Sequence, residues 1–280
     1  MPLQLLLEAP ITFRVGDEVT HAPKVEARVA GSPTKLILDT GSTDHILTTE
    51  LTDRLGLPRT AGEPGTDSAG ASVASWALGD LPIQIAAVSL PLHDVIAIAG
   101  PAPFEGWGVG GFLSPQHLHP TAHAVLDLAH DSLILLEGDE AEVLPWVAAR
   151  FPDLQPVTLE RASGDSTVLI HAAVDDFDPV VTMLDSGAKR TEFAALAMPG
   201  LRGGERQMSG RGVSGTESYG LQVEGATLRV GGVTLTLPSL LVRDEPGNAP
   251  GVIGMDVLRG TVLVVSADPA RHVIWLVNGT

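Results

Sequence analysis

The amino-acid sequence predicts an all-β protein made of two related halves, from its composition, its turn residues and an internal repeat. The chain has 280 residues, enough for one large domain or two small lobes. Hydrophobic residues make up 44% but aromatic residues only 4%, so aliphatic side chains must build the core. This composition favours sheet, because β-branched side chains fit a pleated, half-buried surface. Glycines and prolines lie between short apolar runs, which is typical of turns that join strands.

The repeat begins with two similar segments, 36–42 and 182–188. Each is an apolar run that ends in aspartate, a small hydroxyl residue and glycine. The two aspartates, Asp39 and Asp185, lie 146 positions apart. A single Asp-Thr-Gly is an ordinary turn sequence. Two such turns therefore indicate a repeat only if the segments after them are also similar.

Each copy is followed, in the same order, by a glycine-containing apolar segment and a pair of terminal strands. The apolar segments are Gly-Val-Gly-Gly-Phe-Leu at 108–113 and Gly-Val-Ile-Gly-Met-Asp-Val-Leu at 251–258. Aligning Gly111 with Gly254 gives a separation of 143, close to the spacing of the aspartates. Three landmarks in one order at nearly constant spacing indicate a duplicated unit.

The boundary between the halves is expected within 137–156, where Glu-Gly-Asp-Glu and a proline-containing stretch interrupt the strands. We therefore predict an N-terminal lobe of residues 1–142 and a C-terminal lobe of residues 143–280.

The rest of the chain is expected to form short strands with few helices. The strands predicted in the first half are 25–29, 35–39, 72–78, 83–88, 95–99, 124–128 and 133–136. Those in the second half are 168–174, 180–185, 222–230, 233–237, 240–242, 262–265 and 273–277. Short helices are expected after Ser114 and at 141–150. A third is expected at 48–55, where Thr48 can cap the first turn and Gly56 follows the last.

Asp39 and Asp185 suit the hydrolysis of an amide bond without a metal or a covalent nucleophile. This reaction requires activation of water and protonation of the leaving nitrogen, and two carboxyl groups that share one proton can do both. Like charges about 3 Å apart do not both ionise easily, so one carboxylate acts as the base while its partner donates. We predict that these two residues are catalytic.

The neighbouring residues have supporting roles in this hypothesis. Gly41 and Gly187 would let the backbone turn tightly and approach the opposite loop, because neither has a Cβ. The hydroxyl groups of Thr40 and Ser186 could form hydrogen bonds across a pseudo-twofold axis and hold the two loops together.

The position after each glycine differs between the halves. Ser42 lies where its hydroxyl could bond the outer oxygen of Asp39, whereas Ala188 has no hydroxyl to offer Asp185. The difference predicts an asymmetric pair with the higher pKa at Asp185.

At these residues the sequence resembles the pepsin and retropepsin clan of aspartic peptidases. The resemblance consists of the Leu-Asp-Thr-Gly-Ser and Leu-Asp-Ser-Gly-Ala loops with the later Gly-Val-Gly-Gly and Val-Ile-Gly-Met-Asp-Val-Leu segments, and so covers both halves. It implies a bilobal acid-protease fold with a central cleft, a later segment that supports each aspartate loop, and cleavage of extended peptides without a cofactor. Each half is close in size to a retropepsin subunit, as though a dimer had been fused.

The resemblance also implies a flap, a hairpin that folds over the substrate, between each aspartate loop and the later segment. The matching stretches are 67–76 and 210–219, both rich in small residues. Neither has a clear match to the flap tyrosine of pepsins; Trp76 and Tyr219 are each open to a substrate-binding or a core role. The flap residues named as substrate-binding candidates are Gly70, Trp76, Gly212, Gly215 and Tyr219.

Other features limit the functional class. The formal charge of −17 disfavours binding to a nucleic-acid backbone, and the absence of cysteine excludes thiolate chemistry. No apolar run is long enough for a membrane span, and a cytoplasmic location is expected. The histidines after Ser114 match no ligand pattern and 175–179 lacks the glycine and closing glutamate of a calcium loop, so turns are predicted and no metal or cofactor is expected.

The function predicted from sequence is an aspartic endopeptidase that acts on peptide or protein substrates, with a monomer sufficient for the site. The alternative is a catalytically inactive pepsin-like protein that binds peptides or regulates a partner. The sequence favours the enzyme because both aspartates, both glycines and both hydroxyl residues are present.

Overall fold

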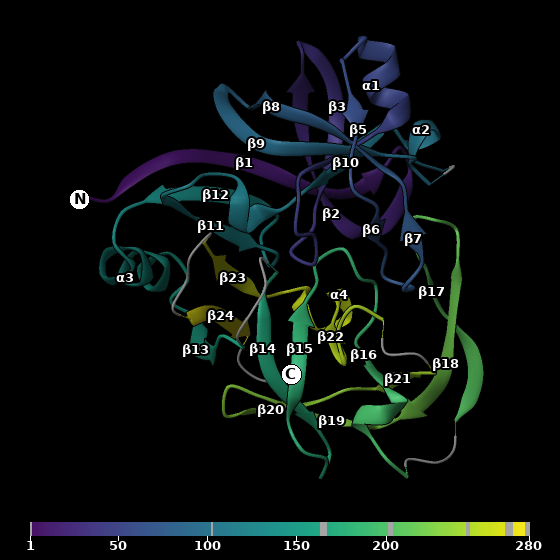
Figure 1. Ribbon diagram of the computed structural model, residues 1–280. Coiled ribbons are helices and arrows are strands. Elements are labelled where there is room, and N and C mark those ends of the chain that lie inside the picture. Colours follow the sequence, from purple (N-terminus) through teal and green to yellow (C-terminus); the bar gives the residue numbers. More distant parts are fainter. Residues whose placement is uncertain are drawn as a thin grey trace.

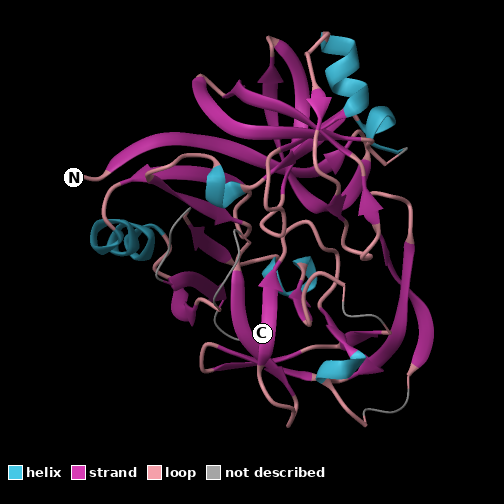
Figure 2. Cartoon of the chain, in the orientation of Figure 1, coloured by secondary structure: helices cyan, strands magenta, loops and turns pink. Residues whose placement is uncertain are grey.

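The computed structural model describes residues 2–101, 103–162, 167–200, 204–244, 247–266 and 271–277. Strands dominate both halves and only short helices interrupt them, which confirms the all-β, bilobal prediction (Figure 2). In Figure 1 the strands around β3 and β9 form an upper lobe and those around β15 and β18 form a lower one.

The first half contains twelve strands among its described residues. They are β1 (Gln4–Val15), β2 (Glu18–Val29), β3 (Ser32–Leu38), β4 (Ile46–Thr48), β5 (Thr60–Ala61), β6 (Gly65–Thr66), β7 (Ser72–Val73), β8 (Ser75–Ile85), β9 (Val88–Ile98), β10 (Val109–Leu113), β11 (Ala122–Asp127) and β12 (Ser132–Glu137). Most of them belong to one sheet in the order β12-β1-β2-β3-β10-β4-β9-β8-β5. The strand β8 also pairs with β2, so this part of the sheet closes on itself.

The second half contributes a nine-stranded sheet in the order β17-β18-β21-β16-β22-β15-β14-β19-β20. Its strands are β14 (Leu169–Val174), β15 (Val180–Leu184), β16 (Glu192–Ala194), β17 (Glu205–Arg211), β18 (Glu217–Glu224), β19 (Thr227–Val230), β20 (Val233–Thr236), β21 (Ser239–Arg243) and β22 (Gly251–Ile253). Three further strands, β13 (Leu154–Glu160), β23 (Val262–Val265) and β24 (Arg271–Val277), leave this sheet and join the first half.

Strands of both halves therefore share a sheet, through the antiparallel pairing of β11 with β23. Ala124 pairs with Val265, and Asp127 with Val262. The helix α3 (Glu140–Arg150) lies between the halves in sequence, and the predicted boundary at residue 142 falls within it. In Figure 1 this helix lies beside the shared sheet.

The helices are short and have local causes. The helix α1 (Thr49–Leu55) begins where the Thr48 hydroxyl accepts a hydrogen bond from Leu51 N at 3.2 Å, and it ends at Gly56, whose φ is 63°. Both ends match the sequence prediction, because a hydroxyl cap and a left-handed glycine satisfy terminal backbone groups. The others are α2 (Pro103–Trp107), α4 (Met255–Leu258) and two single 3₁₀ turns at Pro115–His117 and Ala195–Ala197. No helix among the described residues is long and apolar enough to cross a bilayer.

Two strand predictions were wrong because each ran across a turn. The segment predicted at 83–88 contains the end of β8, a turn at Ala86 with φ of 51°, and the start of β9. The segment predicted at 222–230 is interrupted at Gly225, whose φ of 70° ends β18. In both places alternating apolar residues continue through the turn, so the hydrophobic pattern does not mark it. By contrast, the predicted turn at 175–179 lies between β14 and β15, where Asp175 has φ of 45°.

Candidate active site

Each aspartate follows a central strand that pairs in parallel with the later glycine-containing strand. Asp39 comes directly after β3, and its N–H donates to the Leu113 carbonyl of β10 at 2.8 Å. Asp185 comes directly after β15, and its N–H donates to the Ile253 carbonyl of β22 at 2.9 Å. Both loops are thus fixed to rigid, buried strands.

This geometry corrects the alignment of the two halves. Leu113 and Ile253 make the same contact, so the equivalent positions in the glycine-containing segments are 140 residues apart. Gly111 therefore corresponds to Gly251, rather than to Gly254. Sequence comparison chose the wrong glycine because both segments contain more than one.

The hydroxyl groups of Thr40 and Ser186 tie the two loops together. Thr40 Oγ1 donates to the Leu184 carbonyl at 2.6 Å, and Ser186 Oγ donates to the Leu38 carbonyl at 2.7 Å. Each hydroxyl oxygen also accepts the backbone N–H of the other residue, at 3.1 and 3.0 Å. Both side chains are fully buried. These reciprocal bonds leave little freedom in the relative position of the loops.

The two loop glycines face the opposite aspartates. A Cβ on Gly41 would lie 2.7 Å from Cγ of Asp185, and a Cβ on Gly187 would lie 2.8 Å from Cγ of Asp39. Neither glycine has a positive φ, so the close approach of the loops, rather than an unusual turn, requires glycine here.

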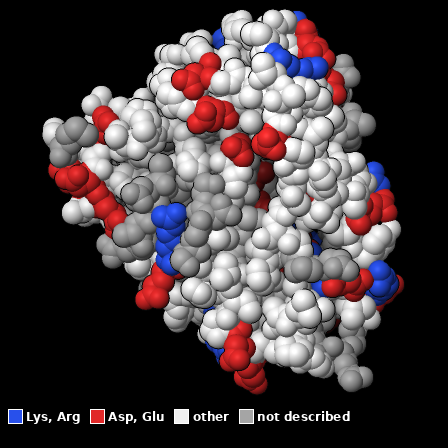
Figure 3. Space-filling model, viewed as in Figure 1, with Lys and Arg blue, Asp and Glu red and all other residues white. Residues whose placement is uncertain are grey.

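The two half-buried carboxyl groups form one hydrogen-bonded pair. Burial raises the pKa of Asp39 well above its ordinary value, and the neighbouring charge of Asp185 raises it further. Burial also raises the pKa of Asp185, where the hydrogen bond from Asp39 and backbone N–H groups oppose the rise. The pKa values of both carboxyl groups are therefore raised, and the two groups titrate as one pair. Figure 3 shows a narrow hollow near the middle of the visible face, with atoms of acidic side chains inside it.

The hydroxyl contact on which the predicted asymmetry depended is not formed. The Ser42 hydroxyl donates to the Asp44 carbonyl at 2.8 Å instead of to Asp39. Asp185 Oδ1 accepts the backbone N–H groups of Gly187 and Ala188 at 2.7 and 3.0 Å. Asp39 Oδ1 likewise accepts the backbone N–H of Gly41 at 2.9 Å, so backbone donors stabilise the ionised form of both carboxyl groups.

Sequence reasoning missed two further supports of the loops. His45 is buried; its Nδ1 accepts the N–H of Ser114 at 3.3 Å and its Nε2 donates to the His117 carbonyl at 3.0 Å. Burial lowers the pKa of His45 to about 4, so the ring is neutral at physiological pH. In the second half Thr191 takes the same place, with its Oγ1 accepting the N–H of Gly254 at 3.2 Å. Their spacing is the signal that could have found them, because His45 and Thr191 lie 146 positions apart, as Asp39 and Asp185 do.

The buried amide of Gln116 and the carboxylate of Asp256 are also at equivalent positions. Gln116 Nε2 donates to the Ser42 carbonyl at 3.1 Å. Asp256 accepts the backbone N–H and the hydroxyl of Thr191 at 2.9 and 2.7 Å. A third contact crosses between the halves, where His21 Nε2 lies 3.1 Å from the Gly187 carbonyl.

The predicted flap stretches form two hairpins whose tips touch. The N-terminal hairpin is β6–β7 with Gly70 in its turn (φ of 77°), and the C-terminal hairpin is β17–β18 with Gly215 in its turn (φ of 86°). The carboxylate of Asp67 accepts the N–H and the hydroxyl of Ser214 at 3.0 and 2.5 Å. A Cβ on Gly212 would lie 2.0 Å from Asp67 Oδ2, so this glycine permits the contact.

The two aromatic candidates lie in different surroundings. Trp76 is half-buried on β8, and the guanidinium of Arg59 lies 5.1 Å from its ring centre. Tyr219 is 40% exposed on β18 and lines a pocket together with the tip of the N-terminal hairpin. The described residues contain no group of three or more side chains placed to hold a metal ion.

Comparison with known proteins agrees with this architecture. Residues 25–106 match a sequence model described as an aspartyl protease. The whole structure is similar to the crystal structure of an aspartic proteinase from Irpex lacteus, with a TM-score of 0.55, 12% sequence identity and 97% of each chain covered. The search of curated proteins gave no match.

These findings define the class of protein. The chain has the bilobal fold of the pepsin/retropepsin-like clan, and part of its first half carries the sequence pattern of aspartyl proteases. At 12% identity the structural likeness concerns the fold; the chemistry has to be argued from the site.

Proposed function

We propose that the protein is an aspartic endopeptidase that hydrolyses peptide bonds with a water molecule activated by Asp39 and Asp185. The observation that carries the proposal is the reciprocal packing of Gly41 against Asp185 and of Gly187 against Asp39, which supports one shared, hydrogen-bonded carboxyl pair. An arrangement that serves only to hold the lobes together has no need to bury two adjacent carboxyl groups.

The chemistry uses a pair that holds one proton, which we place on Asp39. Asp185, the ionised member, takes a proton from water as the water oxygen attacks the substrate carbonyl carbon. Asp39, the protonated member, donates its proton to the carbonyl oxygen, which gives a tetrahedral diol. Asp185 then gives its proton to the leaving nitrogen, the C–N bond breaks, and a diol hydroxyl returns its proton to Asp39, which leaves a carboxylic acid product and restores the carboxyl pair. The reaction as written uses no cofactor.

Peptide or protein substrates are supported by the aspartyl protease match. Because both aspartates come from one chain, we also propose that a monomer is sufficient for activity. The cytoplasmic location expected from sequence and the origin of the two halves by duplication are further parts of this proposal. The duplication agrees with equivalent contacts at His45 and Thr191 in the two halves.

The test is cleavage of an unbiased peptide library between pH 3 and pH 8 by the wild type, Asp39→Asn and Asp185→Asn. Asp176→Asn, at an exposed turn, is the matched control. We expect cleavage by the wild type and the control, and a loss of at least about a thousandfold in both dyad variants with folding retained. A folded wild type that binds peptides but cleaves none at any pH would contradict the peptidase and favour the peptide-binding alternative.

A further inference from the structure

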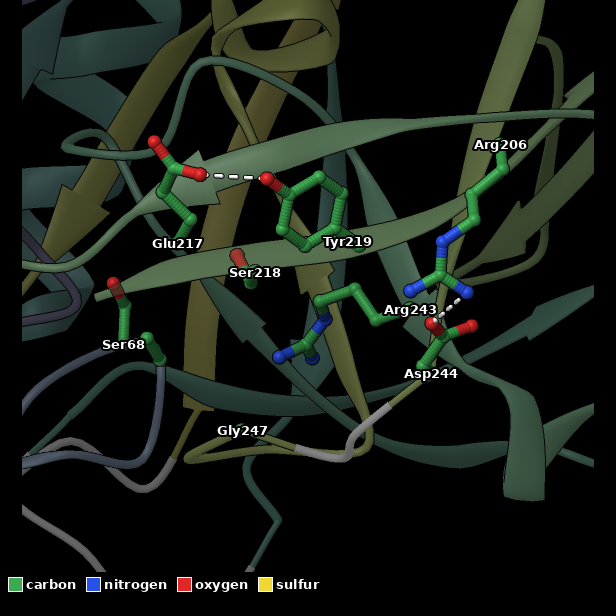
Figure 4. A pocket seen from close by; sticks show the side chains of 9 residues that line it. Ser68, Arg206, Glu217, Ser218, Tyr219, Arg243, Asp244 and Gly247 are labelled. Carbon is green, nitrogen blue, oxygen red and sulfur yellow. Dashed lines mark hydrogen bonds and ion pairs between the residues drawn. The ribbon is translucent and has the colours of Figure 1, made fainter.

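A pocket of about 210 Å³ lies between the two hairpin tips and the second-half sheet. Ser68 and Ala69 come from the N-terminal hairpin, and Glu217–Tyr219 from the C-terminal one; Arg206, Arg243, Asp244 and Gly247 complete the lining (Figure 4). Both halves of the chain thus contribute to one small, polar pocket.

Arg243 brings a buried charge to this pocket. The residue is only 4% exposed, and its Nη2 donates to the Ala249 carbonyl at 2.8 Å. Its Nε lies 3.2 Å from Glu192 Oε2, but the alignment is too poor for a hydrogen bond, and both atoms are buried without another partner. A guanidinium has five N–H donors and stays charged when buried, so this side chain is incompletely satisfied.

The end of this guanidinium packs directly against Gly247. A Cβ at this position would lie 2.0 Å from Arg243 Nη1 and 3.0 Å from the Ser68 carbonyl. The φ of 60° is a second reason for glycine here. Figure 4 shows the end of the Arg243 side chain turned toward the region between Gly247 and Ser68. Because Arg243 also lines the pocket, a ligand atom can approach its guanidinium from there.

The acidic side chains of the pocket already have other partners. Asp244 pairs with Arg206 at 2.8 Å. Glu217 accepts the Tyr219 hydroxyl at 2.6 Å and pairs with Arg211. Burial raises the pKa of Glu192, and the neighbouring charge of Arg243 opposes this rise. Arg243 is thus a buried charged group of the pocket with unused hydrogen-bonding capacity, in a protein whose formal charge is −17.

The pocket belongs to the region of the carboxyl pair. Arg243 ends β21, which pairs in parallel with β16 so that Ala194 is opposite Arg243. The strand β16 begins at Glu192, seven residues after Asp185, and the charge of Asp185 contributes to the raised pKa of Glu192 after burial. An extended peptide that passes under the two hairpins would present a side chain or its end to this pocket.

We propose that this pocket is a carboxylate subsite, in which Arg243 Nη1 binds an aspartate or glutamate side chain, or the free C-terminal carboxylate, of the substrate. The proposal deepens and rests on the proposed peptidase function. An arginine fits this task because its planar donors match a carboxylate, and pairing would satisfy a buried charge.

The first experiment uses the wild type and changes the substrate, so it does not depend on folding of a variant. In the best-cleaved peptide, each position is replaced in turn by Asp, Asn, Glu and Gln, and the C-terminus is prepared as acid and as amide. At pH 6, where these carboxyl groups are ionised, we expect kcat/KM about tenfold or more higher for the acid form at one position. A preferred internal position identifies a side-chain carboxylate, and a preference at the terminus alone identifies the chain end. Equal rates for acid and amide forms at every position would overturn the proposal.

The second experiment locates the preference. Arg243→Gln is expected to remove the preference for the acid, and Arg243→Lys, which keeps the charge and is the safer variant for folding, to retain part of it. Arg229→Gln is the matched control, because Arg229 lies on β19, with four strands between it and β21. A folded Arg243→Gln protein that keeps the full preference would also overturn the proposal.

Binding of the same peptides to Asp39→Asn separates this inference from the proposed function. If the wild type cleaves nothing but Asp39→Asn binds acid peptides about tenfold more tightly than amide peptides, the peptidase fails and the subsite is supported. If the wild type cleaves peptides with no preference for acids, the peptidase is supported and the subsite fails.

Discussion

At the scale of single residues, the short distance between the Asp39 loop and the Asp185 loop limits which side chains fit there. Gly41 and Gly187 have ordinary backbone angles, yet each lies against the opposite carboxyl group. Thr40 and Ser186 are fixed by hydrogen bonds that a residue without a hydroxyl cannot make. The identity of these four residues is therefore a consequence of bringing two loops into contact.

We predict that Gly41→Ala reduces kcat/KM by at least about a hundredfold, since displacement of a catalytic group by about 1 Å has an effect of this size. The added Cβ would lie 2.7 Å from Cγ of Asp185, so the loops must move apart. Gly106→Ala is the control, because a Cβ there meets nothing within 4 Å. Steady-state kinetics with thermal unfolding checks the prediction; wild-type kinetics in a stable Gly41→Ala protein would contradict the close approach of the loops.

A second residue-scale prediction concerns Asp39 and the pH dependence of stability. A carboxyl group with a raised pKa in the folded state favours folding fully only below its unfolded pKa of about 3.9. Its contribution is lost as the pH rises through the folded pKa. Asp39→Asn cannot ionise, so we expect the variant to have a higher Tm than the wild type at pH 7, and the gain to shrink toward pH 3.

Calorimetry across this pH range, with the exposed Asp176→Asn as control, measures the difference. A gain in Tm that is the same at pH 3 and pH 7 would show that Asp39 is not held protonated by its surroundings.

At the scale of elements, Asp67 joins the tips of the two hairpins. Its carboxylate accepts two N–H groups of its own turn, from Ala69 and Ala71, both at 3.0 Å, and two donors of Ser214 from the other hairpin. Burial opposes ionisation of Asp67, but these donors, led by Ser214, hold its pKa below the ordinary value. The hairpin tips are therefore ordered by each other as well as by their own turns.

We predict that Asp67→Ala raises the hydrogen-exchange rate of the amides in 66–73 and 212–216 by about tenfold or more, since hydrogen bonds to a charged group contribute about 1.5–3 kcal/mol. Ser214→Ala, which removes only the hydroxyl, should have a smaller effect. The carboxylate contributes stability above its unfolded pKa of about 3.9, and the contribution is lost as the pH falls through the lower folded value. The effect should therefore be present at pH 7 and decline in strong acid.

Exchange measured by mass spectrometry, with Asp176→Ala as control, checks this contact. Acceleration confined to 66–73, with no change in 212–216, would contradict a direct bond between the hairpins.

At the scale of the whole molecule, the shared sheet makes the two lobes depend on each other. The pairing of β11 with β23 joins the halves, and the paired residues Leu126 and Leu263 are fully buried. Arg259 of the second half also contacts the first: it pairs with Asp131 at 2.6 Å, and its guanidinium lies 3.9 Å from the ring centre of Phe13. The active site is thus formed by loops of two lobes with a common base.

We predict that the protein unfolds in a single transition, with equal calorimetric and van 't Hoff enthalpies, because neither lobe keeps its buried sheet when the other unfolds. Leu263→Ala should lower the stability of the whole protein by about 2–5 kcal/mol, and exposed Val19→Ala by much less. Two separate transitions, only one of them shifted by Leu263→Ala, would contradict this coupling.

The sequence alone determined the β class, the two halves and the aspartate loops, because these depend on local composition and on repeated residues such as Asp39-Thr40-Gly41. It failed where the hydrophobic pattern continues through a turn, as at 83–88, and where several glycines offered alternative alignments. It also did not identify β1 or β13 as strands, since their partners are far away in the chain.

Only the tertiary structure decided the electrostatics of the pair and the long-range contacts. The raised pKa values depend on the burial of two neighbouring carboxyl groups, and the hairpin contact joins Asp67 to a residue 147 positions away. Arg243 became a candidate for the same reason: its burial and its place in the pocket lining depend on Gly247 and on segments distant in sequence. Residue types limit which chemistry is available, whereas desolvation and distance, which exist only in the folded chain, determine which groups carry it out.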